Sequence, residues 1–406
     1  MIPITTPSGR LLGTLVNPFR KTLCPNCFER IYLSDCEIQI EAPDPASPDP
    51  SNPSYIQKNL PAPQGIDKLI RRFWLPPLIG RKNISRKAAR LCPNPKCHKP
   101  LPINIERMEN RIIGIIGLPR SGKSHYITAL IQELQKPDIV EVFGAGSYFR
   151  GLNAEVDSRY NTEFYQPLFQ RNEPIVFTQG GVSPAPLIYT LAIRGDSPLR
   201  PVRRFSLLFY DGSGQDIETK GLREKFARYI YNSAALIYII DPGELRSIPK
   251  EVASALNLPP REATKLPPAK IMDDIARSLR DDSGLMEDAP IPSPTAFTLA
   301  KSDLLKYFPG VNETNQTFMR KADYENGFRF SDIDAISSEV EEFVKKYDVE
   351  IWNSSQSYGK VRYFAVSATG CGLDPTTNKY PFVEPRRCLD PLFWVLYQLG
   401  AVRPKE

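Results

Sequence analysis

Residues 117–124 read GLPRSGKS, and this stretch constrains the fold more than any other part of the chain. It fits the pattern G-x-x-x-x-G-K-[ST], in which a glycine-bearing loop joins a buried strand to a helix and holds phosphate groups. The required context is present, because the apolar run IIGII precedes the loop and SHYITALIQELQK, with apolar residues at helical spacing, follows it. The sequence therefore predicts a phosphate loop between a strand and a helix.

The residue types in this loop match what a polyphosphate needs. Gly117 and Gly122 let the backbone approach closely, so that N–H groups and the start of the next helix face the negative charge. Lys123 supplies a cation to the β and γ phosphates, and Ser124 offers its hydroxyl to Mg²⁺. For Arg120, a phosphate contact and an ordinary surface position both stay open. The candidate nucleotide contacts in this region are Gly117, Arg120, Ser121, Gly122, Lys123, Ser124 and His125.

From residue 111 onward, strand-like and helix-like segments alternate. Apolar runs typical of strands occupy 186–193, 204–211, 234–241, 296–300 and 361–368. Helical spacing of apolar residues marks 270–282, 331–347 and 390–400. This alternation predicts an α/β fold with a mostly parallel sheet and helices on both of its faces.

Three short segments follow predicted strands, at the sheet edge where nucleotides bind in such folds. Residues 211–214 read DGSG, where the Asp211 carboxylate can reach Mg²⁺ through water and the Gly214 amide can contact a γ-phosphate; an ordinary Asp-Gly turn is the alternative. In Lys301-Ser302-Asp303, the aspartate can accept two hydrogen bonds from the N1–H and N2–H₂ edge of guanine, and the lysine stem can lie along the base.

The third segment, Ser367-Ala368-Thr369, can present a backbone N–H to guanine O6. In their order along the chain, the segments GLPRSGKS, DGSG, AKSD and SAT resemble the signature elements of the translation-factor-related and Ras-like (TRAFAC) class of P-loop GTPases. The resemblance covers roughly residues 111–403 and is closest to large bacterial GTPase domains that carry an N-terminal zinc ribbon. It implies a P-loop NTPase fold that binds GTP, GDP and Mg²⁺.

The resemblance also implies roles in hydrolysis. Gln215 stands where this class places the glutamine that orients the attacking water, although a solvent-facing glutamine is the alternative. The switch threonine should precede the strand at 186–193, and we expect Thr178, with Thr162 as the reserve. Together with Lys123, Gln215 and Thr178 form the predicted catalytic set. Turnover without an arginine finger is slow in this class, which implies a partner-dependent switch.

Two departures from the family pattern keep other functions open. Ala300 stands where the class usually carries Asn or Thr, a side chain that braces the phosphate loop. The spacings are also long, with 88 residues from Lys123 to Asp211 and 90 from Asp211 to Lys301, which predicts insertions around both switches. A scaffold that holds a nucleotide without turning it over and an ATPase are the alternative functions.

Four of the seven cysteines form two short pairs, CPNC at 24–27 and CPNPKC at 92–97. Four thiolates at such spacing can close a tetrahedral Zn²⁺ site, because each pair forms a turn whose amides point at the sulfur atoms. The predicted ligands are Cys24, Cys27, Cys92 and Cys97, with Cys36 and His98 as competing ligands. A redox dithiol and free buried thiols are the alternatives. A full set of four thiolates leaves no open position, so a structural metal is expected.

Charge and proline usage set the N-terminal part apart. Residues 1–111 hold 17 Lys and Arg against 9 Asp and Glu, a net charge of +8, whereas the remainder has 35 against 37. Eight of these basic residues lie between 68 and 90, next to Phe73 and Trp74, and can meet an acidic protein, nucleic acid or an anionic membrane; a solvated basic face is the alternative. The proline-rich stretch 42–64 predicts an irregular insertion. We expect a zinc-ribbon domain at 1–110 and a GTPase domain at 111–406.

Composition excludes several classes. The two histidines leave little room for a histidine-rich metalloenzyme, and no apolar run approaches the roughly 18 residues needed to span a bilayer. The start MIPITTPSGR lacks the apolar core of a secretory signal. The sequence therefore predicts a cytoplasmic protein whose partners are a guanine nucleotide and a protein bound through the zinc ribbon or the switch regions, with nucleic acid as a further candidate.

Overall fold

The computed structural model describes residues 2–5, 11–15, 21–43, 55–75, 88–102, 105, 109–117, 121–175, 186–194, 203–209, 227–256, 258, 267–324 and 329–403. The chain divides into two compact units. The N-terminal unit comprises residues 1–110 with 204–206, and the larger unit comprises 111–203 with 207–406.

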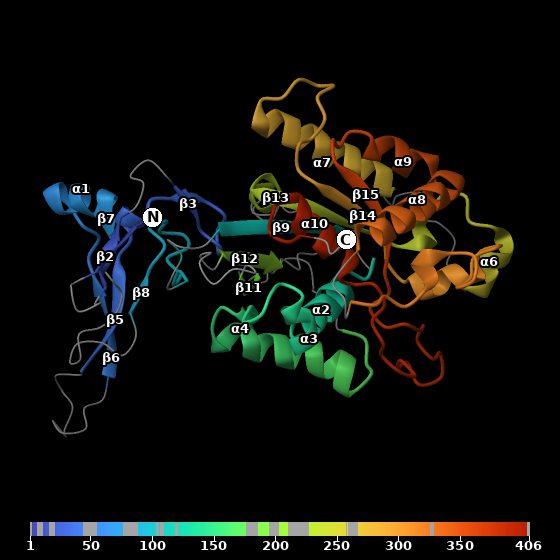
Figure 1. Cartoon of the computed structure of the whole chain (residues 1–406), viewed down its shortest axis with the longest axis horizontal. Helices are drawn as coiled ribbons and strands as arrows, with labels where there is room; N and C mark the ends of the chain where they lie inside the picture. The colour runs from blue at the N-terminus through green and yellow to red at the C-terminus, as the bar shows by residue number, and fades with distance from the viewer. Residues whose placement is uncertain are drawn as a thin grey trace. The chain divides into compact units, whose positions relative to one another are not determined.

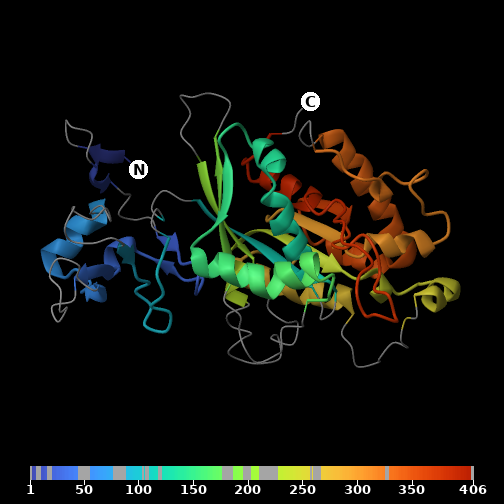
Figure 2. The ribbon, with the colours of Figure 1, turned by 90° about the horizontal axis from the view of Figure 1, so that it is seen from below.

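A seven-stranded sheet organises the larger unit (Figure 2). Its strand order is β10 (Tyr148–Gly151), β11 (Leu187–Ile193), β12 (Arg203–Phe209), β9 (Glu109–Gly117), β13 (Ser233–Ile240), β14 (Thr295–Leu299) and β15 (Val361–Ala365). β9, β13, β14 and β15 are joined by parallel pairings, and β10 pairs antiparallel with β11 at the edge. The predicted α/β fold with a mostly parallel sheet is therefore confirmed.

Residues of β15 show that helices cover both faces of the sheet. The Tyr363 side chain points to one face, where its hydroxyl shares a hydrogen bond with Ser355 Oγ on α9 (Val349–Ser355). Its backbone amide donates a 3.0 Å hydrogen bond to Ser337 Oγ on α8 (Phe330–Tyr347). The ring of Phe364 lies 6.1 Å from Trp394 on α10 (Asp390–Gln398). Because the side chains of neighbouring strand residues point to opposite faces, α9 and α10 lie on opposite sides of the sheet. The prediction of helices on both faces is confirmed.

The predicted insertions contain additional helices (Figure 1). After the phosphate-loop helix α2 (Lys123–Leu134) come α3 (Pro137–Glu141), the edge strand β10, α4 (Ala154–Arg159) and a π-helical continuation, η3 (Tyr160–Gln170). After β13 come η5 (Pro242–Glu244), α6 (Lys250–Ala255) and α7 (Pro268–Ser283). The remaining helices of the larger unit, in the part the structure describes, are η6 (Ser302–Tyr307), η7 (Thr317–Met319) and α9 (Val349–Ser355).

The N-terminal unit is built from small antiparallel sheets. Their strands are β1 (Ile2–Thr5), β2 (Leu11–Leu15) and β7 (Trp74–Leu75); β3 (Thr22–Leu23) and β4 (Arg30–Ile31); and β6 (Tyr55–Leu60), β5 (Ile38–Pro43) and β8 (Ala88–Arg90). A short 3₁₀ helix, η1 (Leu33–Asp35), and the helix α1 (Gly65–Phe73) complete the described elements of this unit.

The proline-rich stretch 42–64 is not irregular throughout, and that prediction was wrong in part. Residues Tyr55–Leu60 form β6, which pairs antiparallel with β5 from Ile38↔Leu60 to Pro43↔Tyr55. The sequence of β6, YIQKNL, contains no proline, so all of its amides remain able to bond across the pair. Residues 44–54, which carry most of the prolines, lie outside the described residues.

Within the described ranges, no helix is both long enough and apolar enough to cross a bilayer.

Candidate functional site

Four parallel strands end at one level and place the candidate nucleotide site along one edge of the sheet. In the strand register, Gly117 of β9 lies beside Ile239 of β13, and Ile240 lies beside Leu299 of β14. Leu299 in turn lies beside Ala365 of β15. Carboxyl ends of parallel strands meet at the same edge, so the phosphate loop, 300–303 and 367–369 come together there.

Close packing explains why the phosphate loop begins with glycine. A Cβ atom on Gly117 would lie 2.5 Å from Ser121 Oγ, closer than real Cβ atoms pack, and 3.1 Å from the backbone oxygen of Ile239, tighter than most Cβ contacts. Gly122, directly before α2, has a φ of +91°, a conformation that side chains strain to adopt. Both predicted glycines are therefore required by the local backbone.

Ser121 and α2 give this loop its polar character. The Ser121 hydroxyl is buried, and within the described residues it has no hydrogen-bond partner. Lys123, Ser124 and His125 occupy the first turn of α2, where the unbonded N–H groups of a helix favour anions. Thr128 Oγ1 donates to the Ser124 carbonyl at 2.7 Å, and the far side of α2 is buried in the core. The first turn of α2 is thus continued by a helix whose next residues, from Tyr126 to Ile131, are all buried.

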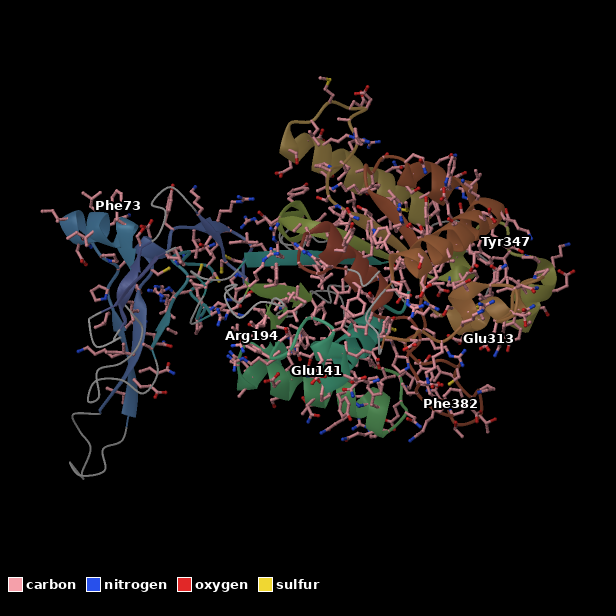
Figure 3. All side chains as sticks on the ribbon, viewed as in Figure 1. Phe73, Glu141, Arg194, Glu313, Tyr347 and Phe382 are labelled. Carbon is pink, nitrogen blue, oxygen red and sulfur yellow. The ribbon has the colours of Figure 1, made fainter. Side chains whose placement is uncertain are left out.

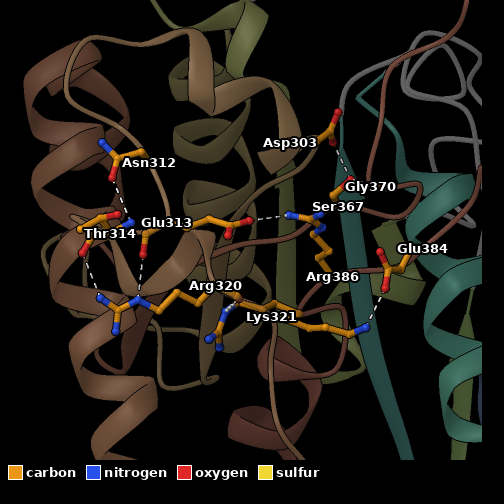
Figure 4. A network of polar contacts seen from close by, with 11 residues as sticks. Asp303, Asn312, Glu313, Thr314, Arg320, Lys321, Ser367, Gly370, Glu384 and Arg386 are labelled. Atoms are coloured by element: carbon orange, nitrogen blue, oxygen red, sulfur yellow. Dashed lines mark hydrogen bonds and ion pairs between the residues drawn. The ribbon is translucent and has the colours of Figure 1, made fainter.

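On the other side of the site, Asp303 is a buried carboxylate with a fixed orientation. Ser367 Oγ donates to Asp303 Oδ1 at 2.5 Å, and Asp303 is 7% exposed (Figure 4). The backbone of this segment is tied to both neighbouring strands, because the Ala300 amide donates to Ile240 and the Ser302 amide donates to Val366. The structure therefore brings Asp303 and Ser367 together, two residues predicted from separate segments. We call 300–303 and 367–369 the base-side segments.

Lys301 connects the base-side segments to the phosphate loop. Its backbone is left-handed, with a φ of +50°, and its Nζ lies 2.6 Å from Asp241 Oδ2 at the end of β13. A Cβ atom built on Gly122 would lie 3.9 Å from Lys301 Cε and 3.8 Å from Ala300 Cβ. Ala300 is buried and so packs against the phosphate loop without the polar brace that Asn or Thr would supply. Asp241 is a neighbour of the site that the sequence did not single out.

The loop after Ser367 is anchored to the base-side segments. The Gly370 amide donates to Ser367 Oγ at 2.8 Å, so one hydroxyl orients both this loop and Asp303. Gly370 has a φ of +75°, and a Cβ there would lie 2.5 Å from the Glu384 backbone oxygen. Ser367 and Arg386 exchange two backbone hydrogen bonds of 3.0 and 2.7 Å. Ala368, the other predicted contact here, lies within this turn.

Ion pairs hold the same loop against the segment that follows η6 (Figure 4). Arg386 lies 3.2 Å from Glu313, and Lys321 lies 2.6 Å from Glu384. These surface pairs each contribute little to stability, but together with the backbone bonds they fix the position of the loop.

Tyr380, in this loop, is a site residue that sequence reasoning missed. Its hydroxyl lies 3.2 Å from His125 Nε2 at the start of α2, and its amide donates to Asn172 at 2.7 Å. Burial and the charge of Asp303 raise the pKa of Tyr380 to about 12. The loop therefore joins the base-side segments to the phosphate-loop helix. No motif in the sequence marks Tyr380, because the contact spans 255 positions of the chain.

Several predicted residues cannot be placed. The predicted contacts and catalytic residues Arg120, Thr178, Asp211, Gly214 and Gln215 lie outside the described residues. The reserve switch residue, Thr162, lies on η3 and is exposed, and its hydroxyl donates to the Ser158 carbonyl one turn earlier. The predicted catalytic roles and the Mg²⁺ ligand Asp211 remain predictions.

In the N-terminal unit, the four predicted thiols converge. The Sγ atoms of the four-cysteine cluster, Cys24, Cys27, Cys92 and Cys97, all lie within 4.8 Å of one another. The Cys24–Cys97 distance is 4.0 Å and the Cys27–Cys92 distance is 3.8 Å. In a tetrahedral zinc site with Zn–S bonds of about 2.3 Å, sulfur atoms lie roughly 3.8 Å apart. The cluster is therefore compatible with a zinc site.

The two cysteine pairs adopt matching turns. The Cys24 carbonyl accepts from the Phe28 amide, and the Asn94 carbonyl accepts from the amides of Cys97 and His98. The residue after each second cysteine is left-handed, with a φ of +61° at Phe28 and +42° at His98. Hydrogen bonds from the neighbouring thiols, Cys24 first, lower the pKa of Cys97. Hydrogen bonds with the other thiols, Cys27 first, together with burial raise the pKa of Cys24, so the four thiols do not all favour the thiolate form.

The competing ligands are engaged elsewhere. The Cys36 thiol donates to the Tyr32 carbonyl at 3.9 Å, and burial raises its pKa to about 12. His98 Nε2 lies 3.4 Å from Glu37. Neither belongs to the group of four sulfur atoms. Among the other cysteines, Cys388 is buried and donates to the Ser367 carbonyl, and Cys371 donates to the Phe382 carbonyl.

Comparison with known proteins gives a relative by sequence. The chain is 24% identical over 337 residues to the "Putative ESX-1 scaffolding and assembly protein SaeC" of Mycolicibacterium smegmatis, a match that spans 78% of this chain and 81% of that protein. No family model matches the chain.

Among solved structures, the chain is similar to several nucleotide-bound proteins. The Saccharomyces cerevisiae Ski7 GTPase-like domain bound to GDP and phosphate is 12% identical, with a TM-score of 0.33 over 72% of this chain and 51% of that chain. The Chaetomium thermophilum signal recognition particle receptor complex SRb-GTP/SRX is 15% identical, with a TM-score of 0.28 over 65% of this chain and 94% of that chain. A single-residue variant of Aquifex aeolicus Era bound to GDP and AlF₄⁻ is 12% identical, with a TM-score of 0.26 over 74% and 59%. Similarity at this level says nothing of function, which depends on the site residues.

Proposed function

We propose that this chain binds GTP and GDP with Mg²⁺, hydrolyses GTP slowly and acts as a nucleotide-dependent switch. The observation that carries the proposal is the placement of Asp303, a buried carboxylate that Ser367 holds at 2.5 Å and that shares one sheet edge with the phosphate loop. Lys301, two residues away, lies against Gly122 of that loop.

Base recognition follows from the acceptor capacity of Asp303. An ionised carboxylate has about four lone-pair sites, and Ser367 Oγ uses one of them. The rest can accept from the N1–H and N2–H₂ groups of guanine, whereas adenine lacks this pair of donors. The serine–aspartate bond fixes the carboxylate before the base arrives, which reduces the entropy lost on binding. The backbone at Ser367 and Ala368 can donate an N–H hydrogen bond to guanine O6.

Phosphate recognition rests on the loop and the first turn of α2. Gly117, Gly122 and the start of α2 offer backbone N–H groups, and the buried Ser121 hydroxyl is a further donor without a protein partner in the described residues. Lys123 adds a positive charge, with His125 beside it and Arg120 as a candidate. Ser124 and Asp211 would hold Mg²⁺, which supplies charge neutralisation when bound. Gln215 would orient the attacking water, and Thr178 would contact Mg²⁺ and the γ-phosphate.

We also propose one structural zinc ion in the four-cysteine cluster. The sulfur spacing fits a tetrahedral site, and four thiolates leave no position for a substrate or water. In the described part of the N-terminal unit, a small buried apolar cluster consists of Cys24, Ile31, Cys36, Cys92, Leu101 and Ile105. A bound metal would add the stability that so small a core lacks. The unit would then be available as a surface for a protein partner.

A second candidate function is a scaffold that binds a nucleotide without turning it over. The observation that favours it is the relative named as a putative scaffolding and assembly protein, which the chain matches over most of both lengths. Ala300, which lacks the polar brace at the phosphate loop, is compatible with this function and with an ATPase.

Two measurements separate these functions. In a filter-binding competition, GTP should displace labelled GTP while ATP should not; effective competition by ATP would overturn the role given to Asp303. In a phosphate-release assay, the wild-type chain should turn over GTP slowly and Gln215→Ala should reduce that rate further. Binding without phosphate release, even with candidate protein partners present, would favour the scaffold.

A further inference from the structure

Helix α1 carries its apolar residues on one side, and that side faces solvent. Ile66, Leu69, Ile70 and Phe73 recur at positions i, i+3, i+4 and i+7, which form one stripe along a helix. Their exposed fractions are 77%, 59%, 49% and 49%. Figure 3 shows Phe73 at the surface of its unit. We call these four residues the α1 stripe.

The helix is attached to its own unit through the opposite, polar side. Lys68 lies about half a turn around the helix from the α1 stripe, and its Nζ lies 3.3 Å from Asp35 Oδ1 on η1. Leu33 of η1 packs against the buried cluster that contains Cys24 and Cys92. This arrangement is the reverse of an ordinary surface helix, whose apolar side packs on the core and whose charged side faces water.

The charges on α1 indicate what the stripe binds. The helix carries three basic residues, Lys68, Arg71 and Arg72, against one acidic residue, Asp67. Aromatic residues Phe73 and Trp74 stand at its end. Anionic lipid headgroups attract such basic residues, and aromatic side chains favour the boundary between headgroups and acyl chains.

Length then decides how α1 can meet a membrane. Nine residues at 1.5 Å per residue give a helix of about 14 Å, far short of the roughly 30 Å hydrocarbon core. A short helix with a strong division between apolar and basic sides lies in the plane of the interface. A nucleic acid would use the basic residues but leave the α1 stripe in water, so it explains less of the surface.

We propose that α1 is an interfacial anchor that binds an anionic membrane surface through the α1 stripe, with the basic residues of α1 supplying selectivity for negatively charged lipid. The attachment through Lys68 and Asp35 holds the stripe outward before contact. A single short helix gives weak and reversible binding, so the attraction of the basic residues is needed as well. This role does not depend on the nucleotide site.

A vesicle flotation experiment with the full chain tests the proposal. The wild-type chain should float with vesicles of phosphatidylcholine that contain phosphatidylglycerol and remain unbound with phosphatidylcholine alone. Leu69→Ser with Ile70→Ser should weaken binding at least about tenfold, because both side chains lose most of their apolar area. The matched control is Met286→Ser with Val349→Ser, which removes apolar side chains of similar exposure in the larger unit and should leave binding unchanged.

A charge variant and a fold check complete the design. Arg71→Gln with Arg72→Gln should reduce binding to the anionic vesicles and make the remainder less sensitive to salt. Circular dichroism should show the same secondary structure for all variants, since the changed positions of the stripe are exposed.

Three results would overturn the proposal. The first is a wild-type chain that binds neither kind of vesicle. The second is a stripe variant that binds as tightly as wild type. The third is a wild-type chain that self-associates in sedimentation or binds nucleic acid through the stripe, with vesicle binding absent, because the occupant would then be a second copy or a nucleic acid.

Discussion

The four-cysteine cluster and the candidate nucleotide site were both predicted from short motifs, but they are built in different ways. Each cysteine pair closes within its own turn, and the cluster needs one encounter between two turns, seen in the 4.0 and 3.8 Å sulfur distances. The nucleotide site needs four strand ends at one level and a loop that returns from Gly370 to Arg386. A local site depends on its ligands, whereas an assembled site depends on the fold that carries it.

The surrounding core differs in the same way. The seven-stranded sheet buries all residues of β11 and β14, so we expect the larger unit to fold without a ligand to complete it. In the described part of the N-terminal unit, cysteines form half of the buried apolar cluster. Loss of the proposed zinc should therefore disturb folding more than loss of the proposed nucleotide.

The largest effect is expected from loss of the proposed zinc. Cys92→Ser, or strong chelation, should abolish metal binding and unfold the N-terminal unit, because structural zinc contributes about 10 to 16 kcal/mol in small domains. Metal content and circular dichroism measure this. Cys36→Ser is the matched control, since Cys36 is equally buried but outside the cluster, and it should keep one zinc per chain. Metal retained in Cys92→Ser would contradict the assignment of ligands.

A smaller but still large effect is expected from the phosphate loop. Lys123→Ala should weaken nucleotide binding about 100-fold, because several charge-assisted contacts to phosphate are lost together. Titration calorimetry measures the affinity. The control Lys136→Ala removes a lysine beyond the far end of α2 that pairs with Glu133 at 2.7 Å, and it should bind as wild type. Unlike Cys92→Ser, Lys123→Ala should keep its fold. An unchanged affinity would remove the phosphate loop from the site.

Replacement of the base-side carboxylate tests selectivity. Asp303→Asn should weaken GTP binding about 10- to 100-fold and leave ATP binding nearly unchanged, because hydrogen bonds to a charged group each contribute about 1.5 to 3 kcal/mol. Ser367→Ala should give a smaller loss in the same direction, since it frees the carboxylate to move. Ser338→Ala, an exposed serine that donates to its own helix, is the control. Equal losses for GTP and ATP would contradict base recognition by Asp303.

The smallest effect is expected from Tyr380. Tyr380→Phe should speed nucleotide release by about 2- to 10-fold, because it removes one neutral hydrogen bond to His125. With the Tyr380 pKa at about 12, the phenol stays protonated, so the ratio of variant to wild type should be constant between about pH 7 and pH 9. Stopped-flow release of a labelled nucleotide measures it. Tyr307→Phe, at an exposed tyrosine, is the control, and a ratio near one for Tyr380→Phe would make the contact incidental.

Most of the sheet could be predicted from the sequence, because strand and helix periodicities are local. The apolar runs at 112–116, 234–241 and 361–368 became β9, β13 and β15, and the helical patterns became α2, α7, α8 and α10. The error at Tyr55–Leu60 came from reading proline content over too wide a window. The edge strand β10 and the helix η3 were not predicted, because their sequences lack a clear period. The boundary between the domains at residues 110 and 111 remains a prediction.

The sequence by itself predicted the two candidate sites, because phosphate loops and cysteine turns place their functional atoms within a few residues of one another. Only the tertiary structure decided how those groups meet: that Ser367 orients Asp303, that Asp241 pairs with Lys301 and that Tyr380 reaches His125. It also decided that α1 turns its apolar stripe outward. These relations depend on contacts between residues distant in the chain, and no local pattern of residue types encodes them.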